Sequence, residues 1–403
     1  MKRRPLRWIV AAACAALLCV AASASASEGS GADQLNLIIG TQAIGGPYQH
    51  TQRPYLLEVA SEIQAMGSNL IKFSLSPRSY AKKPYRMKRV KGIASMTDLL
   101  TRHPVMQKLM KMPFRYYVVW AHPYNQEKWA DGLEADEETR IYNEFYVLAR
   151  RLLTEYSGTD KVFLLGHWEG DWVLIGKQDP AVDPTPERIR GYAQYLRVRQ
   201  RAVDDAKAQT PHRGVSVYHY AEVNLVQKGI DGRRPTLTNS VLPLVDVDFV
   251  SYSAYDSIFA DDPRQALHAA LDHIEAQLRP RDGLRGKRVF VGEFAVKASA
   301  VGFDPQEHDR RNREIAHATI EWGCPLALYW QFYCNEPSPD RPQPYEGFWL
   351  VDHRGDPTPL YSTLRGYWRS ASRFASKTLR ETGEPPTPSE IREFALEYFK
   401  PTP

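Results

Sequence analysis

The sequence predicts an α/β fold: a (β/α)8 TIM barrel, forming a single main domain with a short C-terminal helical tail. Eight short apolar segments are each followed by a helical or loop-rich segment, the order expected of parallel strands joined by crossovers. No Pro-, Gly- or Ser-rich linker and no repeat interrupts residues 28–373, and about 345 residues suits a barrel with insertions. The competing open doubly wound sheet would carry a glycine-rich phosphate loop after its first strand, and residues 40–47 lack that spacing.

The first 26 residues have the features of a secretory signal peptide. Residues 1–8 are basic, residues 9–22 are apolar but too short for a stable membrane anchor, and small residues with Ala-x-Ala sites precede Ser27. We therefore expect an exported protein, periplasmic or extracellular, that starts near Ser27 and has no membrane attachment after cleavage. An uncleaved N-terminal anchor is the alternative.

Removal of this segment changes the charge of the protein. The formal net charge of +5 includes Lys2, Arg3, Arg4 and Arg7, so the remainder carries about +1. Overall charge therefore gives no indication of a nucleic-acid partner. A local basic run remains, for which a solvated loop is the default interpretation and contact with an anionic substrate the alternative. It consists of Lys82, Lys83, Arg86, Lys88, Arg89 and Lys91.

The cysteines do not suggest a disulfide-stapled protein. Cys14 and Cys19 lie in the predicted signal peptide, and Cys324 and Cys334 flank an apolar run. If that run is one extended strand, its ends lie roughly 30 Å apart, beyond the ~7 Å limit for a disulfide. We expect two free thiols.

The predicted strands and helices alternate through the main domain, residues 28–376. The strands are Leu35–Gly40, Asn69–Leu75, Tyr116–Ala121, Val162–Gly166, Val215–Tyr220, Val247–Tyr252, Val289–Gly292 and Leu326–Phe332. The helices are Pro54–Met66, Met96–Met112, Glu137–Tyr156, Pro186–Ala208, Pro263–Leu278, Gln306–Trp322 and Leu360–Ser376. The segment from Asn224 to Leu244 is the least helical connection. Residues 377–403 are predicted to form a linker and one capped C-terminal helix.

Polar and aromatic side chains gather where the predicted strands end, which is the end of a (β/α)8 barrel that carries active sites. Glu169 follows the fourth strand and Glu293 the seventh. Two carboxyl groups across a cleft are the equipment of glycoside hydrolysis, one protonating the leaving oxygen and one attacking the anomeric carbon. Environments that differ would keep one protonated and the other ionised.

These residues resemble a known family. Glu at the end of strand four, Tyr in the strand-six region, Glu at the end of strand seven and Trp in strand eight are similar to clan A of the retaining glycoside hydrolases, which share a (β/α)8 barrel. The resemblance implies that Glu169 is the acid/base and Glu293 the nucleophile. It also implies cleavage with retention, for which the carboxyl groups should lie about 5–5.5 Å apart, against ~9 Å for inversion.

The resemblance and the strand-end pattern give a set of expected substrate-binding residues. Tyr252 or Tyr255 would match the tyrosine that hydrogen-bonds the nucleophile, and Trp330 the tryptophan beneath the innermost sugar. The clan usually has Asn directly before the acid/base, where this chain has Trp168. The full expected set is His122, His167, Trp168, Asp171, His219, Tyr252, Tyr255 and Trp330.

Two other functions stay open at this point. His122, His167 and His219 could form a catalytic zinc site, although none is at a short metal-ligand spacing from another. Alternatively, the barrel could bind a polysaccharide of the cell envelope without cleaving it. This hypothesis stays open because Trp168 replaces the Asn that usually precedes the acid/base. The preferred interpretation is a glycoside hydrolase acting on an oligo- or polysaccharide with no cofactor; the sequence says nothing of oligomeric state.

Overall fold

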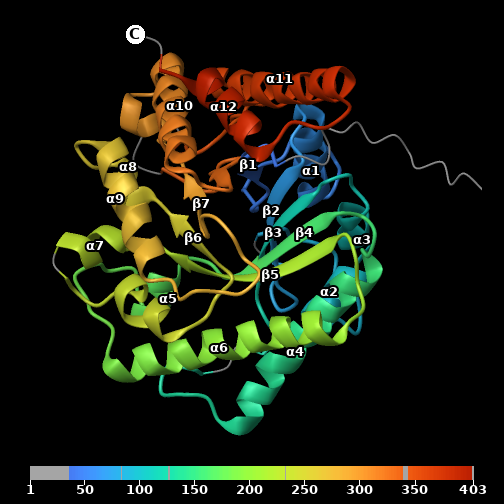
Figure 1. Ribbon diagram of the computed structural model, residues 1–403, viewed down its shortest axis with the longest axis vertical. Helices are drawn as coiled ribbons and strands as arrows, with labels where there is room; N and C mark the ends of the chain where they lie inside the picture. The colour runs from blue at the N-terminus through green and yellow to red at the C-terminus, as the bar shows by residue number, and fades with distance from the viewer. Residues whose placement is uncertain (1–35, 83, 126–127, 232, 339–343, 402–403) are drawn as a thin grey trace, which may run out of the picture.

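Eight parallel strands form a closed barrel in the computed structural model, which describes residues 36–82, 84–125, 128–231, 233–338 and 344–401 (Figure 1). Each strand pairs with the next along the chain, and β1 (Ile39–Gln42) pairs with β8 (Ala327–Tyr329) to close the ring. The predicted TIM barrel is confirmed. The other strands are β2 Leu70–Leu75, β3 Tyr116–Ala121, β4 Lys161–Gly166, β5 Val215–Val223, β6 Phe249–Ser253 and β7 Val289–Phe294.

Three strand boundaries differ from the sequence prediction in ways that affect the site. β1 begins at Ile39, later than predicted, and Leu35 lies outside the described residues. β8 is shorter than predicted. β5 continues to Val223 because the backbone pairing with β6 extends through Val223↔Tyr252. Residues that the sequence placed after β5 therefore belong to the strand.

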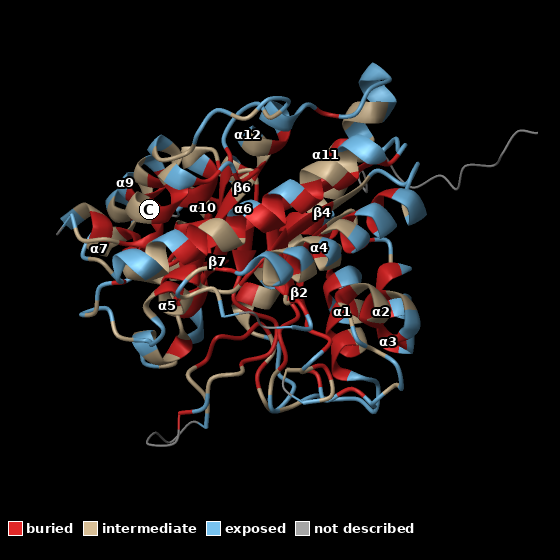
Figure 2. Cartoon of the chain, turned by 90° about the horizontal axis from the view of Figure 1, so that it is seen from below, coloured by how far each residue is buried: buried red, intermediate tan, exposed pale blue. Residues whose placement is uncertain are grey.

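The helices cover the outside of the barrel, as a parallel sheet requires because both its faces are apolar. Figure 2 shows the strands as buried and the outward faces of the helices as exposed. The main ones are α1 Tyr55–Met66, α2 Met96–Arg102, α3 Pro104–Met110, α4 Ala135–Glu155, α6 Pro186–Gln209, α9 Pro263–Ala276 and α10 Pro305–Trp322. Short helices α5 Gly170–Ile175, α7 Val226–Asp231 and α8 Tyr255–Ile258 lie in the connections at the strand ends.

The single helix predicted over Met96–Met112 is two helices. Pro104 cannot continue α2 because it has no N–H and disfavours a helical residue before it. His103 lies between them in an extended conformation and its Nδ1 accepts the backbone N–H of Val105 at 3.2 Å, so it caps the start of α3.

The C-terminal helices pack on the barrel beside β1 (Figure 1). In α11 (Pro359–Thr382), Trp368 Nε1 donates to the carbonyl of Ile39 at 2.9 Å. The predicted boundary after residue 376 is wrong, because α11 continues to Thr382 and ends at Gly383, whose φ of 81° suits glycine. α12 (Pro388–Phe399) buries Ile391, Ala395 and Phe399. The tail is therefore part of the cover of the barrel.

The predicted signal peptide, residues 1–26, lies outside the described residues. Within the described ranges, no helix has the length and apolar character needed to cross a membrane. Cys324 and Cys334 are both buried and unpaired, which confirms the prediction of two free thiols.

Replacing Trp368 with alanine tests the contribution of α11 to the barrel. The indole is fully buried, and its loss leaves a cavity and the carbonyl of Ile39 without its donor. We expect Trp368→Ala to lower the free energy of unfolding by about 3–5 kcal/mol, measured by urea titration. The neighbouring exposed residue provides the control, Arg369→Ala, which should change it by less than about 0.5 kcal/mol. Equal unfolding midpoints for the two variants would contradict this assignment.

Candidate active site

A cavity of about 1140 Å³ opens at the C-terminal ends of the strands and is called the main cavity below. Its walls come from the loops after β1 and β2 and from residues at the ends of β3, β4, β6, β7 and β8. The lining combines aromatic rings, carboxyl groups and one imidazole. These are Trp120, Trp168, Tyr255, Trp330, Glu169, Glu293, Glu336 and His122. Apolar rings with a few converging polar groups are typical of a ligand site.

Glu169 and Glu293 are brought together by Ser253, at the end of β6. The Ser253 hydroxyl donates to Glu169 Oε1 at 2.7 Å and lies 3.4 Å from Glu293 Oε2. These two carboxylate oxygens are therefore no more than about 6 Å apart, the sum of the two distances, which is close to the range of paired catalytic carboxyls. The barrel thus joins two residues that are far apart in the sequence.

A buried lysine forms an ion pair with Glu293, one member of this pair. Lys72, in the middle of β2, is fully buried, and its ammonium lies 3.1 Å from Glu293 Oε1 and 3.1 Å from Glu222 Oε2. It also donates to the carbonyl of Gly292 at 3.0 Å. A charge removed from water is tolerated when it is paired and its hydrogens are all used, as here.

Glu222 connects this ion cluster to the backbone that carries Glu169. One oxygen, Oε1, accepts the backbone N–H of Glu169 at 2.9 Å, while Oε2 accepts the Ser251 hydroxyl at 2.7 Å. The approach of Ser251 requires glycine at position 292, where a Cβ atom would lie 1.8 Å from the Ser251 hydroxyl oxygen. Side chains of β2, β5, β6 and β7 thus fix both candidate carboxyl groups.

The pKa values of Glu169 and Glu293 are both raised by burial. Burial raises the pKa of Glu169 to about 7; the Ser253 hydrogen bond opposes this rise and the charge of Glu222 adds to it. Burial also raises the pKa of Glu293, an effect that the Lys72 ammonium opposes and Glu222 and Glu169 reinforce. The Lys72 ammonium favours the ionised form of Glu293, which it contacts directly, and it also lowers the pKa of Glu169.

Asp171 and His167 lie beside the main cavity and support its loops. Asp171 is buried and accepts backbone N–H groups of Asn224, Leu225 and Leu237. His167 Nε2 accepts the backbone N–H of Glu222 at 3.3 Å, and burial lowers the His167 pKa to about 3, so the ring is neutral. The prediction that these two side chains contact substrate is wrong; they hold β4 and its turn against β5.

The prediction that His219 and Tyr252 contact substrate is also wrong. Side chains alternate between the two faces of a strand, and both of these point away from the barrel interior. In β5, Glu222 points into the barrel, so His219 points outward, where its Nδ1 lies 3.2 Å from Gln200 of α6. In β6, Ser253 points inward, so Tyr252 points outward and bonds Asp256 and Ser257. Neither residue lines the main cavity.

The zinc alternative is not supported by this arrangement. His122 lines the main cavity, His167 turns toward the backbone of Glu222, and His219 faces α6. Across the part of the chain that the structure describes, no group of three His, Cys, Asp or Glu side chains is placed to hold a metal ion.

His122, Trp168, Tyr255 and Trp330 line the main cavity with Glu169 and Glu293, and their contact with substrate stays a prediction. Burial lowers the pKa of His122 to about 4, so this imidazole is neutral near pH 7. The buried Tyr255 hydroxyl and the indole N–H of Trp120 have no hydrogen-bond partner among the described residues. They are donors available to a ligand.

Several members of the site were not predicted from the sequence: Lys72, Trp120, Ser253 and Glu336, and Glu222 as part of the ion cluster. One signal could have found Lys72. It is a charged residue within the apolar run Leu70–Leu75, and a charge inside a barrel strand requires a buried partner.

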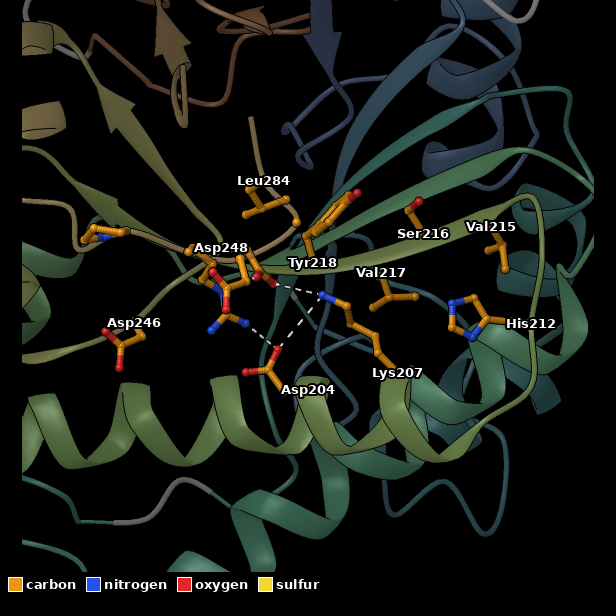
Figure 3. Close-up of a pocket in the computed structure, with 14 residues that line it drawn as sticks. Asp204, Lys207, His212, Val215, Ser216, Val217, Tyr218, Asp246, Asp248 and Leu284 are labelled. Atoms are coloured by element: carbon orange, nitrogen blue, oxygen red, sulfur yellow. Dashed lines mark hydrogen bonds and ion pairs between the residues drawn. The ribbon is translucent and has the colours of Figure 1, made fainter. Parts of the chain in front are cut away.

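A second large cavity, of about 740 Å³, lies at the opposite, N-terminal ends of β5 and β6 (Figure 3). Its buried carboxylate, Asp248, is paired within the protein: Arg281 pairs with Asp204 and with Asp248, and Lys207 lies 3.9 Å from Asp248. Features at this end of a TIM barrel serve stability. We interpret these ion pairs as ties between α6 and the loops before β6 and β7.

Solved structures with a similar fold are clan A glycoside hydrolases. A GH5_18 protein from Bifidobacterium longum subsp. infantis has a TM-score of 0.52 and 13% identity, over 83% of this chain and 78% of that one. The exo-β-1,4-mannosidase Op5Man5 from Opitutaceae bacterium strain TAV5 has a TM-score of 0.51 and 13% identity, over 84% of this chain and 60% of that one.

A family 39 glycoside hydrolase from Bacteroides cellulosilyticus WH2 has a TM-score of 0.46 and 13% identity, over 83% of this chain. The chain spans 64% of that protein, which is less than two thirds of its length. No protein-family model and no curated protein matches the chain. The structural likeness confirms, for the fold, the resemblance to clan A noted in the sequence.

Replacing Lys72 with methionine tests the ion cluster through stability. The variant leaves Glu222 and Glu293 buried together without their ammonium, so we expect a loss of about 3–5 kcal/mol in the free energy of unfolding at pH 8. A folded-state pKa that lies above the unfolded value means that stability falls as pH rises. Because Lys72 lowers the pKa of Glu293, its removal should steepen that fall, and the loss should be smaller at pH 5.

Urea unfolding at the two pH values measures this effect. Lys377→Met, on the exposed face of α11, controls for removal of a lysine, and Lys72→Met with Glu222→Gln should recover part of the stability by removing one carboxylate. A loss in Lys72→Met that is the same at pH 5 and pH 8, with no recovery in the double variant, would show that the cluster is not electrostatically coupled.

Proposed function

We propose that the protein is a glycoside hydrolase that cleaves its substrate with retention by double displacement. One observation carries the proposal: Glu169 and Glu293, at the ends of β4 and β7, face one cavity and share the hydroxyl of Ser253. The two oxygens that Ser253 contacts are no more than about 6 Å apart, which supports the ~5–5.5 Å separation of carboxyl groups in retaining enzymes over the ~6.5–9.5 Å of inverting ones.

Glu293 serves as the nucleophile in this mechanism. Its carboxylate attacks the anomeric carbon, the bond to the leaving oxygen breaks, and an ester joins the sugar to the protein. The Lys72 ammonium at 3.1 Å favours the ionised carboxylate that the attack requires. Because Lys72 also holds Glu222, the same ion cluster keeps Glu293 in a fixed orientation.

Glu169 serves first as an acid and then as a base. With a pKa of about 7 it is protonated in about half of the molecules at neutral pH, and the protonated form can transfer its proton to the leaving oxygen as the glycosidic bond breaks. In the second step it accepts a proton from the water that attacks the anomeric carbon and releases Glu293. After the first step the ester of Glu293 carries no charge, which favours the ionised form of Glu169 when a base is needed.

The remaining residues of the main cavity supply contacts to the sugar. Trp120 and Trp330 pack against each other with ring centroids 5.9 Å apart and offer flat apolar surfaces to a pyranose ring. Trp168 occupies the position where clan A proteins usually have an Asn, and His167 points toward the backbone of Glu222. Neither side chain therefore offers an amide to the 2-hydroxyl of the sugar. We assign polar contact with the sugar to His122 and Tyr255, which line the same cavity.

Kinetics of two variants test the proposal. On a panel of aryl glycosides and polysaccharides, Glu293→Ala should lower kcat by at least about 10³-fold on every substrate. Glu169→Ala should lose most activity on poor leaving groups and retain it on dinitrophenyl glycosides, because these leave without protonation. Glu381→Ala, an exposed change on α11, is the control and should leave kcat unchanged.

No turnover by the unaltered protein, together with saccharide binding that survives in both variants, would contradict the proposal. That result would favour the carbohydrate-binding alternative.

A further inference from the structure

A separate cavity of about 510 Å³ adjoins the main cavity on the side of β1 and β2. Gly46, Pro47, Pro84 and Arg86 line both cavities, so the two lie side by side with Arg86 between them. The smaller one, here called the basic cavity, has positive side chains from two loops: Arg53 from the β1–α1 loop, and Arg86 and Lys88 from the β2–α2 loop. None of its described lining residues is Asp or Glu.

Among the residues that the structure describes, these three cations have no acidic partner. Arg53, Arg86 and Lys88 are exposed, and within the described ranges no carboxylate lies within 4 Å of any of them. Nearby Arg102 differs, since it lies 3.5 Å from Asp98. Like charges gathered without counter-charges repel one another, and an arrangement of this kind attracts anions.

The Arg86 loop is anchored against the barrel. The Tyr85 hydroxyl accepts the backbone N–H of Ser74 at 2.7 Å and donates to the carbonyl of Ala43 at 2.9 Å, so the loop is tied to both β1 and β2. Gly45 lets Pro84 approach, because a Cβ at Gly45 would lie 1.9 Å from the Pro84 carbonyl oxygen. Arg86 itself has a φ of 51°, a conformation that costs a non-glycine residue energy and is held by these contacts.

The Lys88 end of the loop is fixed as well. His103 Nε2 lies 3.0 Å from the carbonyl of Lys88, while its Nδ1 accepts the N–H of Val105. With Nδ1 accepting, Nε2 donates to the carbonyl of Lys88, so both ring nitrogens of His103 are used within the protein. The positive charge of the basic cavity therefore comes from its arginine and lysine side chains, and their positions are set before any ligand binds.

The two neighbouring cavities differ in charge. Glu293 and Glu336 line the main cavity, where an anionic group would be repelled by their carboxylates, whereas the basic cavity would attract it. A saccharide with an anionic substituent would be oriented by this difference, with its charge beside Arg86 and its scissile bond beside the carboxyl pair. The half-buried Tyr48 also lines the basic cavity and offers a ring surface to the sugar that carries the charge.

We propose that the substrate is an anionic saccharide and that Arg53, Arg86 and Lys88 bind its carboxylate, sulfate or phosphate group in the basic cavity. The inference rests on the proposed function, because it assigns a substrate class to the same site. Guanidinium groups suit all three anions, since each offers paired oxygens to the planar N–H donors. Two members of the basic run at residues 82–91, Arg86 and Lys88, would therefore bind the anionic group of the substrate.

Equilibrium binding to matched ligands tests the inference independently of turnover. Oligouronides and their methyl esters share sugar and linkage but differ in charge, and sulfated oligosaccharides and their desulfated forms make a second pair. By calorimetry with the full-length chain, we expect the charged member of at least one pair to bind at least about 10-fold more tightly, with Arg86→Ala removing most of that difference. Which pair shows the preference distinguishes carboxylate from sulfate ester.

Arg89→Ala is the matched control: an exposed arginine on the same loop that lines neither cavity, so its loss should leave the preference intact. Equal affinity for charged and neutral members of both pairs, no binding of any charged member at millimolar concentration, or equal losses in Arg86→Ala and Arg89→Ala would each overturn the inference. Glu293→Ala should bind the charged member with its preference unchanged. A protein without hydrolytic activity that keeps this preference would contradict the proposed function and leave the anion site standing.

Discussion

The site depends on one buried ion cluster, in which the ammonium of Lys72 lies between the carboxylates of Glu222 and Glu293. Its members come from β2, β5 and β7, and only a closed barrel brings the inner faces of these strands to one point. The cluster sets the position of Glu293 directly and that of Glu169 through the backbone N–H that Glu222 accepts. A buried charge without its partner is costly, so the same contacts that arrange the carboxyl pair also constrain the fold around it.

Around this cluster, polar residues at the strand ends divide into two kinds. Glu169, His122 and Tyr255 face the main cavity and are available to a ligand. Asp171 and His167 are also polar and lie two residues from Glu169 in the sequence. They accept backbone N–H groups instead and so hold loops in place. The rim therefore needs both kinds: exposed groups that can act on a ligand, and buried groups that fix the loops carrying them.

The barrel and the carboxyl pair were predictable because the alternation of strands and helices, and the position of a Glu at a strand end, do not depend on exact strand boundaries. A strand shifted by two residues still ends near Glu169 or Glu293. The contacts of His219 and Tyr252 were not predictable in the same way, because a single residue changes which face of the strand a side chain occupies. Lys72 could be flagged as a charge in an apolar strand, but its partners could not be named, since register across three separated strands decides them. The basic run was visible in the sequence; which of its cations line a cavity depends on the path of the loop.

The most direct test of the account is to trap the covalent intermediate it requires. An activated 2-deoxy-2-fluoro glycoside slows both steps, and the second more than the first, so the ester accumulates and mass spectrometry of the digested protein locates it. The sugar would be chosen from substrates the protein is found to cleave. The account predicts one adduct, on Glu293, and none in Glu293→Gln. An adduct on another carboxylate, or release of a first product with inverted anomeric configuration and no adduct, would contradict it.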